Sequence, residues 1–135
     1  MKKWQIPVLA SALALAAPGC IIVDDDDSAR DVVGVLTVEW TIAGFQDPRD
    51  CVELGIDRFE LVLFDPAGGV VEEFEPFCED FSVSIDLFEG YYYARVTLVD
   101  SFDDAATFSE TLEDLYIEAG TELIVPVDFP PGSFL

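Results

Sequence analysis

The chain has 135 residues, with 28 acidic and 6 basic side chains and no histidine, which gives a net charge of −22 at pH 7. Without histidine, no Ser-His-Asp or Cys-His nucleophile can form, and the imidazole sites that usually hold zinc, copper or non-haem iron are excluded. A polyanion of this size repels nucleic acid and anionic surfaces, so basic proteins and metal ions are its expected partners. Hydrophobic residues make up 51% and aromatic residues 13%, which predicts a folded domain rather than a disordered chain.

The N-terminus has the pattern of an export signal. Lys2 and Lys3 precede an uncharged apolar run at residues 6–17, and this run is too short to span a bilayer, where about 20 apolar residues are needed. The run is followed by Pro-Gly-Cys. A small residue, Gly19, directly before Cys20 resembles the lipobox of bacterial lipoproteins, in which the cysteine is lipidated and the signal is cleaved in front of it. Residues 1–19 are therefore the predicted signal peptide.

The lipoprotein resemblance implies that Cys20 carries acyl chains such as palmitate and is the first residue of the mature protein. Ile21, rather than aspartate, after the cysteine implies delivery to the bacterial outer membrane. The sequence departs from the lipobox in having Ala17 where leucine is usual and Pro18 beside it. Cleavage by an ordinary signal peptidase after Ala16, which would release a secreted protein, therefore remains the alternative.

Residues 20–31 form the predicted tether between the lipid and the domain. Asp24 to Asp27 are four consecutive like charges, which extend a chain by self-repulsion. At about 3.3 Å per residue, the eleven positions after Cys20 span at most about 35 Å. Residues 32–135 then make one small domain. Once the two lysines of the signal are removed, four basic side chains face all 28 acidic ones, a net charge of −24.

Three cysteines in an exported protein leave one without a partner, and lipidation of Cys20 would remove the odd one. Cys51 and Cys78 are then expected to form a disulfide in an oxidising compartment, which would stabilise the fold by roughly 3 to 4 kcal/mol. Two buried free thiols are the alternative. Hairpin pairing would set Cys51 nearly opposite Ser82 or Val83, so the loop that carries Cys51 must fold back to reach Cys78.

From Val33 onward, apolar residues recur with a period of two, which predicts half-buried strands. The expected inward residues of the first two strands are Leu36, Val38, Trp40 and Ile42, followed by Phe59, Leu61 and Leu63. Residues 44–55 between them are predicted to be a loop. The sequence Asp-Pro-Ala-Gly-Gly at 65–69 predicts a turn, and residues 70–77 a returning strand whose glutamates and Pro76 suit a sheet edge.

Three further strands follow the same alternation. Their expected inward residues are Phe81, Val83, Ile85 and Leu87, then Tyr92, Ala94, Val96 and Leu98, and finally Leu123, Val125, Val127 and Phe129. Residues 100–105 are predicted to be an acidic loop. Residues 107–117 have both helical spacing and strand alternation, and we favour a strand followed by a shorter one at 115–117.

Six or seven strands separated by turns, with no long helix, predict an all-β fold: an antiparallel two-sheet sandwich of about seven strands. The stretch Leu-Phe-Glu-Gly-Tyr-Tyr-Tyr at 87–93 resembles the Gly-x-Tyr strand entry of prealbumin-like and immunoglobulin-like domains. Glu-Ala-Gly at 118–120, with the strand after it, resembles their closing turn and strand. This resemblance implies a fold and no particular activity.

One candidate metal site follows from the acidic loop. Hard cations take carboxylate and carbonyl oxygens, so Asp100, Asp103 and Asp104 are candidate calcium ligands. The loop lacks the Asp-x-Asp-x-Asp-Gly pattern of calcium-binding loops, and the alternative is a solvated acidic loop that aids solubility. Calcium is the one cofactor that the sequence suggests.

A candidate binding face follows from the strand at 91–98. Tyr93 and Arg95 point away from the expected core, and aromatic and arginine side chains contribute much of the energy of protein interfaces. Tyr91 is expected instead to tuck its ring against the strand entry and bond its hydroxyl to backbone, as in a tyrosine corner.

These patterns predict a non-enzymatic protein, because the remaining catalytic option is a carboxylate pair and 28 carboxylates make any such pair unspecific. We expect a lipid-anchored protein of the bacterial outer membrane that displays an acidic β-sandwich as a binding or structural module. The expected partners are the membrane, through the lipid, and an envelope or extracellular protein. The alternatives are a secreted calcium-binding β-sandwich and a carboxylate-based hydrolase.

Overall fold

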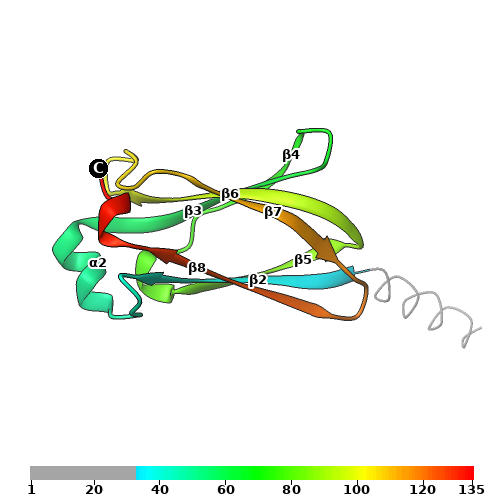
Figure 1. The fold of residues 1–135 in the computed structure, drawn as a ribbon, viewed down its shortest axis with the longest axis horizontal. Helices are drawn as coiled ribbons and strands as arrows, with labels where there is room; N and C mark the ends of the chain where they lie inside the picture. The colour runs from blue at the N-terminus through cyan, green and yellow to red at the C-terminus, as the bar shows by residue number, and fades with distance from the viewer. Residues whose placement is uncertain (1–32) are drawn as a thin grey trace, which may run out of the picture.

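The computed structural model describes residues 33–135, which form two β-sheets packed face to face (Figure 1). The predicted signal peptide, the predicted lipidation site Cys20 and the predicted acidic tether lie outside the described residues. One sheet has the strand order β5 (Ser82–Phe88), β2 (Val33–Ile42), β8 (Glu122–Phe129), and the other β4 (Val70–Phe74), β3 (Ile56–Phe64), β6 (Gly90–Asp100), β7 (Glu110–Ile117). The prediction of an all-β sandwich of about seven strands is confirmed.

One strand pair departs from the antiparallel arrangement that we expected. β2 pairs antiparallel with β5 but parallel with β8, from Val35 opposite Glu122 to Ile42 opposite Phe129. The cause is the turn between β7 and β8, where the backbone N–H of Gly120 donates to the carbonyl of Val33 at 3.0 Å. This turn lies beside the start of β2, so β8 begins where β2 begins and must run in the same direction.

The core lies between the two sheets and consists of the inward residues that the alternation predicts. The fully buried ones are Leu36, Val38 and Trp40 in β2, Phe59, Leu61 and Leu63 in β3, Ala94, Val96 and Leu98 in β6, and Phe129 in β8. Each large side chain buried in this way contributes about 1.5 to 3 kcal/mol to the free energy of unfolding. The core therefore fixes which face of each strand is turned to solvent.

The predicted loop at 44–55 contains a short helix, α2 (Pro48–Leu54), which the sequence analysis missed. Asp47 precedes it and accepts a hydrogen bond from the backbone N–H of Arg49 at 3.0 Å, and Gly55, with φ of 72°, ends it. These end signals are present in the sequence. The helix has only two turns and one buried residue, so it shows no apolar periodicity from which to predict it.

Cys51 and Cys78 form a disulfide, with their Cα atoms 6.0 Å apart, as predicted. The loop that carries Cys51 does fold back: α2 brings this residue against the 3₁₀ turn η2 (Cys78–Asp80). Both cysteines are fully buried. The bond ties α2 to the segment between β4 and β5, at the end of the sandwich opposite to the start of β2 (Figure 1).

The ambiguous segment at 107–117 is one strand, β7, that begins at Glu110, and the shorter second strand is wrong. A bulge replaces the expected break. Tyr92 pairs with Leu115 and Ala94 with Leu112, so two residues of β7 lie opposite the single residue between them. The second of these two, Asp114, has φ of 57°, and this left-handed conformation shifts the alternation within the strand.

The edge position of β4 is confirmed, because it pairs with β3 on one side and lies at the end of its sheet. Its glutamates and the proline after it are suited to this position, since an edge strand must avoid pairing with other chains. Within the described residues, no helix is long and apolar enough to cross a membrane.

Candidate functional site

The outward face of the four-stranded sheet carries two aromatic pairs. Strand register sets Phe64 of β3 beside Tyr93 of β6, and Tyr116 of β7 beside Tyr91. The rings of Phe64 and Tyr93 stack with their centroids 4.9 Å apart and their planes 12° from parallel. The rings of Tyr91 and Tyr116 are 4.8 Å apart and inclined at 43°. Four rings from three strands therefore share one sheet face.

The predicted binding pair, Tyr93 and Arg95, lies in this cluster. The guanidinium of Arg95 is 5.2 Å from the centroid of the Phe64 ring, on which Tyr93 also stacks. The sequence analysis missed Phe64, although alternation places it on the outward face of its strand. Its position beside Tyr93 follows only from the pairing of β3 with β6.

A hollow of about 320 Å³ opens beside this cluster, between the β3–β4 turn and the bulge of β7. We call it the tyrosine hollow; its lining residues are Pro66, Tyr91, Tyr92, Tyr93, Thr111, Glu113 and Asp114. A methyl group on Gly68 would lie only 3.8 Å from the Tyr93 hydroxyl, so this hydroxyl reaches the β3–β4 turn. The carboxylate of Asp65 braces that turn, accepting from the backbone N–H groups of Ala67 and Gly69 at 2.9 Å each.

The charge of the tyrosine hollow is negative. Its lining includes the exposed carboxylates of Glu113 and Asp114 and no basic side chain. Residues 33–135 contain only three arginines, and each is engaged elsewhere. Arg49 pairs with Asp47, Arg58 pairs with Asp57, Glu75 and Asp103, and Arg95 lies over the Phe64 ring. An anionic ligand would therefore find no ion-pair partner in this hollow.

The tyrosine corner is formed by Tyr92, and our expectation for Tyr91 was wrong. Tyr92 belongs to the inward set, and its hydroxyl donates to the carbonyl of Phe88 at 2.8 Å. Burial raises the pKa of Tyr92 above its ordinary value. Tyr91 is 61% exposed, and its ring packs on Tyr116. The hydroxyl of Tyr116 donates to the carboxylate of Glu89 at 3.0 Å, which raises the pKa of Tyr116.

The structure does not bring the three candidate calcium ligands together. One carboxylate oxygen of Asp100 accepts hydrogen bonds from two backbone N–H groups of its own loop, at 2.9 and 3.0 Å. Asp103 forms an ion pair with Arg58. In the part of the chain that the structure describes, only the disulfide and its neighbour Glu79 group three residues of metal-ligand type, and those sulfurs are already bonded to each other. Among residues 33–135, Asp104 is thus not grouped with Asp100 and Asp103 as a shared metal site would require.

No family model, curated protein or solved structure matches this chain. Function is therefore inferred from the residues and their geometry alone.

A second hollow, of about 280 Å³, lies between α2 and the 3₁₀ turn η3 (Pro131–Ser133) at the far end of the sandwich. Its lining is Ile42, Ala43, Asp50, Glu53, Leu54, Pro131 and Phe134. This hollow, like the first, has two carboxylates, but it contains no tyrosine. The two hollows can therefore be compared within one molecule, because they are similar in size and in number of carboxylates and differ in their aromatic lining.

Proposed function

We propose that this protein is a lipid-anchored protein of the bacterial outer membrane and that its β-sandwich is a binding module with the tyrosine hollow as its binding site. The observation that supports binding is the tyrosine hollow itself. It joins the exposed ring of Tyr91 and the half-buried ring of Tyr93 to two carboxylates on a sheet face that carries two aromatic pairs. Concave sites with aromatic lining and a few polar groups are where proteins bind ligands most often.

The predicted anchor, together with the point at which the described domain begins, supports an envelope partner. Lipidation at Cys20 with several acyl chains, each methylene worth about 0.8 kcal/mol, would make attachment effectively permanent. The described domain begins at Val33, beside the turn that follows β7, and the tyrosine hollow lies toward this same end, where Gly90 of β6 pairs with Ile117 of β7. The predicted tether, which spans at most about 35 Å, would thus join the domain at the end toward which the hollow lies.

The anchor is tested by the intact mass of the mature protein, extracted in detergent from its native cells and measured before and after reduction. We expect a chain that starts at Cys20 and carries acyl chains, with a mass increase of about two hydrogens on reduction. A Cys20→Ser variant is the matched control and should lose the lipid and leave the membrane fraction. A wild-type mass that begins near Ala17 without lipid would replace the proposal with the secreted alternative.

A further inference from the structure

We propose that the tyrosine hollow binds an alkylammonium or guanidinium cation, namely the side chain of a lysine or arginine on a basic protein partner. This inference rests on the proposed function, because it assigns a ligand class to the binding site of the module. It goes beyond that function in stating which chemical group enters the hollow and which groups of this chain hold it.

The aromatic lining supplies the first kind of contact. A cation within about 6 Å of an aromatic ring face is attracted by the electron density of the ring. Tyr91 and Tyr93 line the hollow, and Phe64 stacks against the second of them. One cation already lies on this same cluster: the guanidinium of Arg95 is 5.2 Å from the Phe64 centroid. The cluster thus shows, within one molecule, the contact that we propose for the ligand.

The carboxylates supply the second kind of contact. Glu113 and Asp114 are exposed at the hollow, and within residues 33–135 neither carboxylate accepts a side-chain hydrogen bond or forms an ion pair. The three arginines of the described domain are engaged outside the hollow. Two carboxylates that have no partner among residues 33–135, beside tyrosine rings, match the two needs of an organic cation, charge neutralisation and an apolar surface for its stem.

The walls of the hollow are already ordered. Asp114 lies in the bulge of β7 and has φ of 57°. This left-handed conformation is uncommon for residues that have a side chain. Such outliers gather at binding sites, where surrounding structure maintains them. On the other side, Asp65 braces the turn with two backbone hydrogen bonds of 2.9 Å. The backbone on both sides of the hollow is therefore held in place before a ligand binds.

The size of the hollow selects a single side chain. Its volume of about 320 Å³ is at the lower end of the range for ligand pockets, about 300 to 1,000 Å³. It therefore suits the head group and stem of one residue. The strongly acidic domain around it would draw a basic protein toward the site from a distance and repel anionic ones.

Paired peptides test the charge requirement directly. The mature full-length protein, in a detergent with a neutral head group, is titrated with acetyl-Gly-Arg-Gly-amide and acetyl-Gly-Lys-Gly-amide while backbone amide resonances are followed by NMR. The controls carry citrulline and Nε-acetyl-lysine, which keep the shape and remove the charge. We expect the cationic peptides to shift the resonances of residues 91–93 and 113–114 and to bind about ten-fold more tightly than their neutral counterparts.

Two double variants separate the site from the overall charge of the domain. Glu113→Gln with Asp114→Asn should weaken binding of the arginine peptide by about three- to ten-fold. Asp50→Asn with Glu53→Gln makes the same change of net charge in the second hollow and should alter affinity less than about two-fold at 0.15 M salt, where the Debye length is about 8 Å. Three of the four carboxylates are exposed and Asp50 is half-buried, and none belongs to the core, so these variants leave the core intact. Tyr93→Leu should remove most of the remaining affinity.

Equal weakening by the two double variants would overturn the proposal, because it would mean that the cation senses only the general field. Equal affinity for arginine and citrulline peptides at the hollow would also overturn the ligand class, while leaving the binding module in place. If none of the peptides, charged or neutral, moved the hollow resonances, the binding role of the hollow would fall as well. The mass measurement of the anchor is independent of all these outcomes.

Discussion

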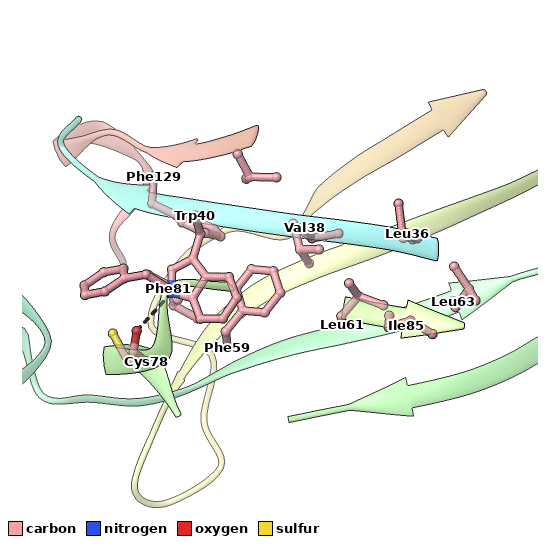
Figure 2. Close-up of a cluster of buried hydrophobic side chains, with 14 of the residues drawn as sticks. Leu36, Val38, Trp40, Phe59, Leu61, Leu63, Cys78, Phe81, Ile85 and Phe129 are labelled. Atoms are coloured by element: carbon pink, nitrogen blue, oxygen red, sulfur yellow. Dashed lines mark hydrogen bonds between the residues drawn. The ribbon is translucent and has the colours of Figure 1, made fainter. Parts of the chain in front are cut away.

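The indole ring of Trp40 in β2 stacks on the phenyl ring of Phe59 in β3, with the ring centroids 3.9 Å apart and the planes 2° from parallel. This contact joins the two sheets within the core (Figure 2). The indole N–H also donates to the carbonyl of Cys78 at 3.0 Å, which Figure 2 shows as a dashed line. Trp40 therefore connects both sheets with the segment held by the disulfide.

Replacement of Trp40 with phenylalanine should lower the free energy of unfolding by about 2 to 4 kcal/mol. The change removes buried volume and leaves the carbonyl of Cys78 with only the longer hydrogen bond, 3.3 Å, from the backbone N–H of Phe81. Urea denaturation followed by far-ultraviolet circular dichroism measures the loss. Phe102→Ala, at a side chain that is 82% exposed, is the matched control and should stay within about 0.5 kcal/mol of wild type. A loss below about 1 kcal/mol for Trp40→Phe would contradict the central role of this ring.

Removal of the disulfide should cost about 3 to 4 kcal/mol, the entropy that a bridge with a sequence separation of 27 takes from the unfolded chain. The measurement compares denaturation curves of the oxidised protein, the reduced protein and the double variant Cys51→Ala with Cys78→Ala. Because both cysteines are fully buried, the reduced protein should also expose α2 to proteases sooner than the sheets. Coincident curves for oxidised and fully reduced protein would show that the bridge adds no stability.

The tyrosine corner gives a matched pair of variants. Tyr92→Phe removes the hydroxyl that donates to Phe88 and should destabilise the domain by about 0.5 to 1.5 kcal/mol. Tyr91→Phe, one residue earlier at an exposed position, should leave thermal stability unchanged. If Tyr91→Phe destabilised the domain and Tyr92→Phe did not, the tyrosine corner would be formed by Tyr91.

Stability should fall at alkaline pH because two tyrosines hold their protons more tightly in the folded state. Burial raises the pKa of Tyr92, and the hydrogen bond to Glu89 raises that of Tyr116, both above the ordinary value of 10.0. Their contribution is thus fully present below pH 10 and is lost as the pH rises through the folded-state values. Unfolding curves recorded from neutral to strongly alkaline pH measure this decline. A variant with Tyr92→Phe and Tyr116→Phe should show a flatter profile, and an identical profile would assign the decline to other groups.

The melting temperature should be the same in millimolar calcium as in magnesium at the same concentration. One carboxylate oxygen of Asp100 accepts from two backbone N–H groups and Asp103 pairs with Arg58, and the three carboxylates of the loop do not converge on one point for a cation. A specific site would instead raise the melting temperature progressively with the ratio of calcium to its dissociation constant. A rise seen with calcium but not magnesium, and lost in Asp104→Asn, would restore the calcium-binding alternative.

The sequence by itself determined the strands, the faces that they bury and the cysteine pair. Alternation predicts which side of a strand enters the core, because successive side chains point to opposite faces and only one face of each sheet is buried. This local rule correctly places Trp40, Phe59 and Phe129 inside. Applied strictly, it would also have assigned the tyrosine corner to Tyr92. The lipid anchor at Cys20 stays a prediction of the sequence pattern.

Only the tertiary structure decided which residues of neighbouring strands contact each other. The stack of Phe64 on Tyr93 and the bulge residues opposite that tyrosine depend on the pairing and register of strands far apart in the chain. The parallel course of β8 depends on where one turn docks against the start of β2. Register arises from the packing of the whole sandwich, because many pairings satisfy the same alternation and only the folded core selects one. The tyrosine hollow is a product of that selection.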